Sequence, residues 1–124
     1  MLRSAVPLAV IGLALCASSA LASRPAHPAE QRAIARAART SPATQGARGK
    51  FDVVRVRIST VVGHWARASL RPKRPYRHQL DTATAVMHLA HARWTVRTLG
   101  TADVGCAVHS RAVRRDLHLQ CGSG

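Results

Sequence analysis

The chain has 124 residues, and its 19 Lys and Arg against 5 Asp and Glu give a formal net charge of +14 at neutral pH. A chain of this length supports one domain with a modest core and leaves no room for a second. The charge exceeds what solubility requires, and it favours anionic partners such as envelope polymers, membrane surfaces or nucleic acid.

Residues 1–22 have the pattern of a signal peptide. Arg3 provides a positive start, "AVPLAVIGLALCASSA" follows as an apolar segment, and Ala20-Leu21-Ala22 fits a cleavage site. The apolar run is shorter than the roughly 20 residues that a spanning helix needs. We therefore predict cleavage after Ala22 and a secreted or extracytoplasmic protein, with an uncleaved anchor as the alternative.

A lipoprotein is a second alternative, because Cys16 follows the short apolar box "LALC". Leu15 stands directly before this cysteine, where signal peptidases require a small residue. This bulky side chain argues against lipid attachment, so we expect Cys16 to be removed with the signal.

The next segments predict a helix between two irregular stretches. Residues 23–28, "SRPAHP", predict a flexible leader, and residues 29–124 a single domain. Residues 29–39 are strong helix formers, and residues 40–50 form a linker of Ser, Pro and Gly. The apolar stripe of the helix is narrow: Ala33, Ile34, Ala37 and Ala38.

Four later segments alternate polar and apolar side chains, which indicates half-buried strands. They span residues 51–59, 64–70, 82–89 and 94–99. The alternation predicts these inward positions: Val54, Val56 and Ile58, then Ala66, Ala68 and Leu70, then Ala83, Ala85, Met87 and Leu89, and last Trp94, Val96 and Thr98. Trp65 belongs in a core by its size, yet it alternates with outward Arg67, so a bulge or another register is required there.

The chain ends in a predicted short helix over residues 109–117, with Ser110 as its N-cap and Val113 and Leu117 on one face. The order of elements predicts an α+β fold. An N-terminal helix packs on a roughly four-stranded antiparallel sheet, and we expect both helices on one face of it.

Cys106 and Cys121 are the cysteines that remain after signal removal. An even pair in an exported protein predicts a disulfide, which here closes the C-terminal helix. A loop of about 15 residues is worth roughly 3 kcal/mol in the chain-entropy model. The spacing does not match a zinc site.

Residues 51–121 resemble small secreted actinobacterial proteins of unknown function, with an S-T-V…W-A hairpin, an R-W-x-V strand, a G-T…C loop and a V-x-x-x-L…C ending. The positions that carry the resemblance are Ser59, Thr60, Val61, Trp65, Ala66, Arg93, Trp94, Val96, Gly100, Thr101, Cys106, Val113, Leu117 and Cys121. The chain departs from the pattern by lacking a Gly before Arg93 and a Pro near Val108. The resemblance implies secretion, the disulfide and a strand-rich fold, with a cystatin-like architecture as an analogy, and it transfers no activity.

No catalytic, metal or cofactor site is predicted. The closest histidine pair, His88 and His91, would face opposite sides of a strand, and no zinc motif occurs. No serine lies in a nucleophile elbow. The acidic residues, Glu30, Asp52, Asp81, Asp103 and Asp116, lie beside basic residues or at element ends, where each is expected to be an ion-pair partner or a cap.

The arginines predict an anion-binding surface, because their forked donors fit phosphates. Its predicted residues are Arg55, Arg57, Arg71, Lys73, Arg74, Arg77, Arg111, Arg114 and Arg115. The expected partner is an anionic cell-wall polymer or a membrane surface. Four aromatic residues in the chain are too few for specific nucleic-acid recognition. The alternative to a binding surface is an arginine-rich composition without a selected partner.

The function predicted from the sequence is therefore that of a secreted, strongly basic, non-catalytic binding domain. The alternative is a ligand-binding or enzymatic domain of cystatin-like or cone-shaped form, with a pocket between helix and sheet. The two differ in whether the concave face of the sheet is open or filled by Trp65, Met87 and Trp94.

Overall fold

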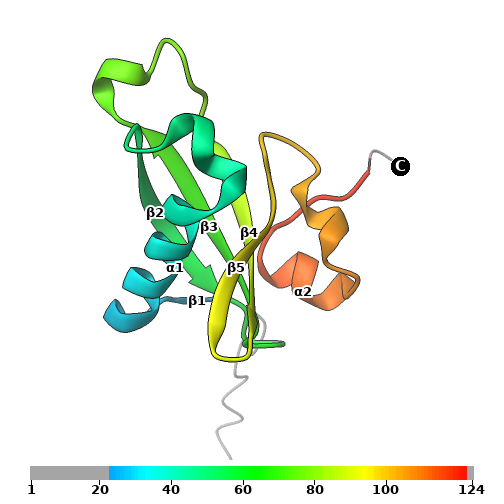
Figure 1. The fold of residues 1–124 in the computed structure, drawn as a ribbon. Helices are drawn as coiled ribbons and strands as arrows, with labels where there is room; N and C mark the ends of the chain where they lie inside the picture. Colours follow the sequence, from blue (N-terminus) through cyan, green and yellow to red (C-terminus); the bar gives the residue numbers. More distant parts are fainter. Residues whose placement is uncertain (1–22, 123–124) are drawn as a thin grey trace, which may run out of the picture.

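The computed structural model describes residues 23–122, so the predicted signal segment and Cys16 lie outside the described residues (Figure 1). The fold is α+β, as predicted, with a five-stranded antiparallel sheet in the order β1-β2-β3-β4-β5. The strands are β1 (Arg24–Pro25), β2 (Phe51–Ile58), β3 (Trp65–Pro72), β4 (Ala83–Ala90) and β5 (Arg93–Gly100). The helices are α1 (Pro28–Thr40) and α2 (Arg111–Asp116), with short 3-10 turns η1 (Pro42–Ala47), η2 (Arg74–Tyr76) and η3 (Val104–Ala107).

The fifth strand comes from the segment that the sequence predicted to be a flexible leader. Arg24 pairs with Ile58 and Pro25 with Arg57, which adds β1 to the edge of β2. Ser23 is buried as well. The prediction of a flexible leader is wrong because β2 offers a free edge whose backbone groups a short extended segment can satisfy.

α1 packs on one face of the sheet. Its buried side chains are Ile34, Ala35 and Ala38, which meet Met87 and Trp94 in the larger of two apolar clusters. The alanines allow the helix to lie close to the strands. The predicted stripe is correct for Ile34 and Ala38, but Ala33 is exposed and Ala35 takes its place.

A second apolar cluster lies on the opposite face of the sheet. It is built from one strand residue and the C-terminal segment: Val86, Val104, Val108, Val113, Leu117 and Leu119. Trp65 packs against it. The expectation that both helices share one face is therefore wrong, and Trp65 needs no change of register, because the face that it shares with Arg67 has a core of its own.

Two bulges change the faces predicted for the strands. One separates Val54 from Arg57 in β2, where Arg55 adopts a left-handed conformation with φ 52°. It lets Val53 and Val56 both face α1, so the inward position predicted for Val54 is wrong. The other lies between the partners of Val86 and Met87 and brings Thr98 opposite Val86, on the face away from α1.

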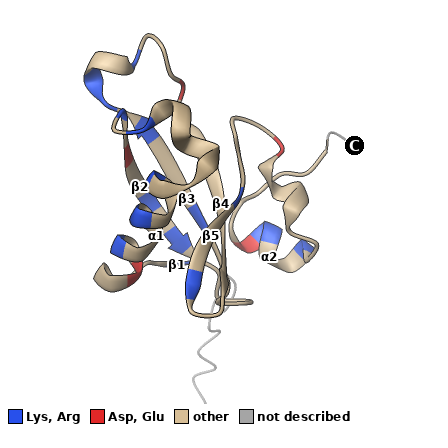
Figure 2. Cartoon of the chain, in the orientation of Figure 1, with Lys and Arg blue, Asp and Glu red and all other residues tan. Residues whose placement is uncertain are grey.

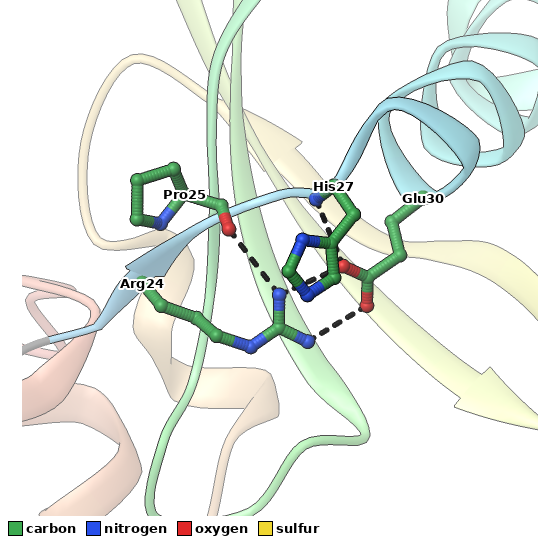
Figure 3. A network of polar contacts seen from close by, with 4 residues as sticks. All are labelled: Arg24, Pro25, His27 and Glu30. Atoms are coloured by element: carbon green, nitrogen blue, oxygen red, sulfur yellow. Dashed lines mark hydrogen bonds and ion pairs between the residues drawn. The ribbon is translucent and has the colours of Figure 1, made fainter.

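The start of α1 is fixed to β1 by a carboxylate (Figure 3). Glu30 accepts two hydrogen bonds from the Arg24 guanidinium, at 2.7 and 2.8 Å, and a third from the His27 backbone N–H at 2.9 Å. A bidentate pair of this kind is stronger than a single charged contact. The Arg24 hydrogen bonds hold the pKa of Glu30 at about 2, below its ordinary 4.5.

Glu30→Gln should therefore change how stability depends on pH. The folded-state pKa of Glu30 is the lower one, so its contribution is full above about pH 4.5 and is lost as the pH falls to about 2. Both side chains are partly exposed, which limits the contribution at neutral pH to about 1 kcal/mol. Urea unfolding between pH 7 and 2 should show wild type and variant converging in acid. Parallel profiles for Glu30→Gln would contradict this assignment.

Candidate anion-binding groove

The basic residues predicted as one surface lie in three separate places (Figure 2). Arg55 and Arg57 are on β2. A second group lies at the end of β3 and in the loop that follows: Arg71, Lys73, Arg74 and Arg77. The third is on α2: Arg111, Arg114 and Arg115. The structure thus divides the predicted surface. Lys73 lines a hollow with Arg39 and Arg48, and the β2 pair lines a larger one with Arg67.

That hollow is a groove of about 580 Å³ on the sheet face away from α1, lined by Ser23, Pro25, Arg55, Val56, Arg57, Arg67, Ser69, Leu117 and His118. Arg57 and Arg67 are direct cross-strand partners in β2 and β3. The bulge adds Arg55, which is exposed. Three guanidinium groups therefore lie in one groove because of the strand register and a single extra residue.

Hydrogen bonds hold two of these arginines in place. Arg57 donates from Nε to Ser23 Oγ at 3.1 Å and from Nη2 to the Ser23 carbonyl. Arg67 donates from Nη1 to the carbonyls of Leu117 and His118, at 3.1 and 2.9 Å. Each guanidinium is anchored to backbone along one side and keeps further N–H donors for a ligand.

The groove has a one-sided charge. No Asp or Glu is among its lining residues, and within residues 23–122 the one ion pair joins Arg24 to Glu30 elsewhere. Like charges that face each other across two strands repel. A bound phosphate or carboxylate would remove this repulsion and accept several charge-assisted hydrogen bonds.

The sequence did not single out two features of this region. Arg67 was recognised as outward-facing but not as a site residue, since its partner Arg57 is set by hairpin register. The second feature is Asp116, which is buried and, among the described residues, serves neither as an ion-pair partner nor as a helix cap, the two roles expected of it. Its position at the end of a short helix gave no signal of burial.

Asp116 joins α2 to the turn between β2 and β3. Its Oδ2 accepts from Ser59 Oγ at 2.8 Å and from the Thr60 backbone N–H at 2.7 Å. Its Oδ1 is buried and, among the described residues, has no hydrogen-bond donor. Together with the Arg67 bonds to Leu117 and His118, this carboxylate fixes the end of α2 beside the groove.

The C-terminal segment is closed by the predicted disulfide. Cys106 and Cys121 are joined, with their Cα atoms 4.7 Å apart. Beside them, Gly105 donates its N–H to the Gln120 carbonyl at 2.8 Å, and a Cβ at this position would lie 2.7 Å from the same oxygen. The loop requires a glycine here because backbone meets backbone, and the disulfide then secures the segment that carries Leu117 and His118.

Of the three side chains expected to fill the sheet face under the helix, Met87 and Trp94 pack there with α1, whereas Trp65 packs on the opposite face. An apolar cavity of about 310 Å³ remains at one end of this layer, between η1 and the strands, with these lining residues: Ala43, Thr44, Gly46, Ala47, Phe51, Leu70, Pro72, Leu80, Asp81, Ala83 and Leu99. This cavity is the place in the described chain that fits the alternative of a ligand pocket.

Residues 23–122 show neither a metal centre nor a membrane-spanning helix. No group of three or more His, Cys, Asp or Glu side chains is arranged to hold a metal ion. No described helix is long and apolar enough to span a bilayer. The His88 ring packs against Trp65 with ring centres 4.4 Å apart and the planes tilted by 50°. Burial, together with nearby Arg97 and His64, lowers the pKa of His88.

Comparison with known proteins gives no match to any family model, curated protein or solved structure. Function must therefore be inferred from the residues of this chain, and the resemblance noted for residues 51–121 stays a prediction.

Proposed function

We propose that this chain is an exported, non-catalytic domain that binds an anionic polymer of the cell envelope or its surroundings in the groove of Arg55, Arg57 and Arg67. The observation that carries the proposal is the cross-strand pair Arg57 and Arg67, joined by Arg55 in one hollow without a lining carboxylate. A disulfide between Cys106 and Cys121 fits an exported protein, because such bonds persist in oxidising compartments.

The geometry favours a polymer over a small metabolite. The groove is open and large for one phosphate, and its donors are spread over β2 and β3. Successive anionic groups of a polymer can occupy such donors together, and each contact releases counterions. The other basic groups, on α2 and after β3, extend the attractive field without forming the site.

Arg55→Asn is the test that least disturbs the fold. Arg55 is exposed and left-handed, and asparagine tolerates that conformation better than most residues. We expect several-fold weaker binding to isolated cell envelope and to soluble polyphosphate, with a smaller salt dependence. Arg32→Gln removes the same charge from the exposed side of α1 and serves as the control.

If Arg55→Asn and Arg32→Gln weaken binding equally, the groove is not the binding site, since only net charge would then matter. DNA and vesicles of neutral lipid complete the panel of ligands. Retention on envelope at physiological salt, with loss from DNA, would identify a wall polymer. Loss of binding to every ligand at modest salt would indicate that the arginines reflect an arginine-rich composition and not a binding site.

The second candidate function is the binding of a small apolar ligand, and the cavity beside η1 favours it. Its walls are mostly alanine, leucine and proline side chains, with Asp81 as the one ionisable group. No pair of acid and base faces this space, so the cavity supports binding rather than catalysis. Failure of all the polyanion measurements would direct attention here.

A further inference from the structure

The turn between β2 and β3 exposes two adjacent apolar side chains. Val61 and Val62 are 38 % and 39 % exposed, and they are the exposed large hydrophobic residues of the described chain. Single exposed apolar side chains are common, but two neighbours at the tip of a hairpin form a small patch that water solvates poorly.

The turn is held in one conformation. Ser59 Oγ accepts from the backbone N–H groups of Val61 and Val62, both at 3.2 Å, while its own hydroxyl donates to Asp116. The Trp65 N–H then closes the turn on the Val62 carbonyl at 3.3 Å. The valines are therefore presented by a braced turn, whose ordering cost on binding is low.

A second hairpin turn lies at the same end of the sheet and adds positive charge. Trp65 pairs with His88, and the His64 carbonyl accepts from the Leu89 N–H at 2.8 Å, which places the β4–β5 turn beside the valines. Residues 60–65 and 88–97 contain no Asp or Glu. The basic side chains of these two segments are His64, His88, His91, Arg93 and Arg97.

The described chain begins at this end of the sheet. Arg24 pairs with Ile58, directly before the turn, which places Ser23 beside the start of the turn that carries Val61 and Val62. The sequence of residues 1–22 contains the apolar run that predicts membrane targeting. Before the predicted cleavage after Ala22, a chain held at the membrane by this run would keep this end of the domain near the lipid surface.

We propose that the tip, defined as Val61, Val62, His64, His91 and Arg93, docks on an anionic lipid bilayer. The valines enter the boundary between headgroups and acyl chains, and the basic side chains contact lipid phosphates. This surface is separate from the polymer groove, and it explains an apolar pair at the edge of an otherwise strongly cationic domain.

The test uses a chain that begins at Ser23 and holds every described element, with vesicles of phosphatidylglycerol and phosphatidylcholine or of phosphatidylcholine alone. Val61→Ser/Val62→Ser should weaken co-sedimentation with anionic vesicles at least tenfold and leave polyphosphate binding unchanged. Arg93→Gln should weaken vesicle binding several-fold, whereas Arg71→Gln, at the opposite end of β3, should have little effect.

Three results would overturn the proposal that the tip docks on a bilayer. Wild-type binding by the valine variant would show that the apolar pair is not used. Equal loss of vesicle and polyphosphate binding by that variant would assign its effect to the fold. Failure of wild type to bind anionic vesicles would exclude a lipid partner, and the groove could still bind its polymer, so the two proposals fail separately.

Discussion

Cys106→Ser/Cys121→Ser is expected to lower the free energy of unfolding by about 3 kcal/mol, because the disulfide restricts a loop of about 15 residues in the unfolded chain. For a domain of roughly 100 residues this corresponds to a fall in Tm of more than about 10 °C. The loss is large because the bonded residues, Cys106 and Cys121, bracket the C-terminal segment that builds the second cluster.

Calorimetry of wild type, the double variant and reduced wild type would measure this effect. Reductant should lower the Tm of wild type to that of the variant and leave the variant unchanged, which separates the bond from the substituted side chains. Polyphosphate binding should persist at temperatures where both proteins are folded. Equal melting of the oxidised wild type and the variant would refute a stabilising disulfide.

Asp116→Ala is expected to cost about 2 kcal/mol, since it removes the carboxylate that accepts hydrogen bonds from the buried Ser59 hydroxyl and from the Thr60 N–H. In wild type, the burial of Oδ1 without a hydrogen-bond donor destabilises the native state. The substitution removes this unfavourable contribution too, which limits the fall in the free energy of unfolding. Asp116→Asn should cost about half as much, because its amide oxygen can still accept these bonds.

Equilibrium denaturation of the variants tests this role, with Asp81→Ala as a control in which an exposed carboxylate is removed. The control should stay within about 0.5 kcal/mol of wild type. Amide exchange should quicken at Val61 and Val62 in Asp116→Ala, because the turn loses its support. Unfolding of Asp116→Ala at the wild-type denaturant concentration would contradict a structural carboxylate.

Strand alternation predicted much of the sheet because the side-chain period of a strand is local. Ala66, Ala68 and Leu70 face the larger core as predicted, and so do Ala85 and Met87 in β4. The prediction failed at Val54 and Thr98, where bulges shift the period. A bulge is selected by the fit of a strand to its neighbours and leaves little trace in the sequence.

The candidate site was predictable only in part. Arg55 and Arg57 were named from their strand, and the structure places them in one groove. Arg67 joins them through cross-strand register, and Ser59 meets Asp116 across 57 positions of sequence. Such pairings depend on how distant segments pack, so composition showed that arginines were abundant but not which of them meet.

The sequence by itself determined the α+β class, the helix, four strands, the disulfide and the excess of positive charge, because these follow from local periodicity, residue type and cysteine count. Only the tertiary structure decided that Arg24 and Pro25 add a fifth strand, that α2 covers the face opposite α1, and that Trp65 packs in a second core. The physical reason is that an edge strand and a sheet face are satisfied by whichever distant segment reaches them, and that choice is made by the whole chain.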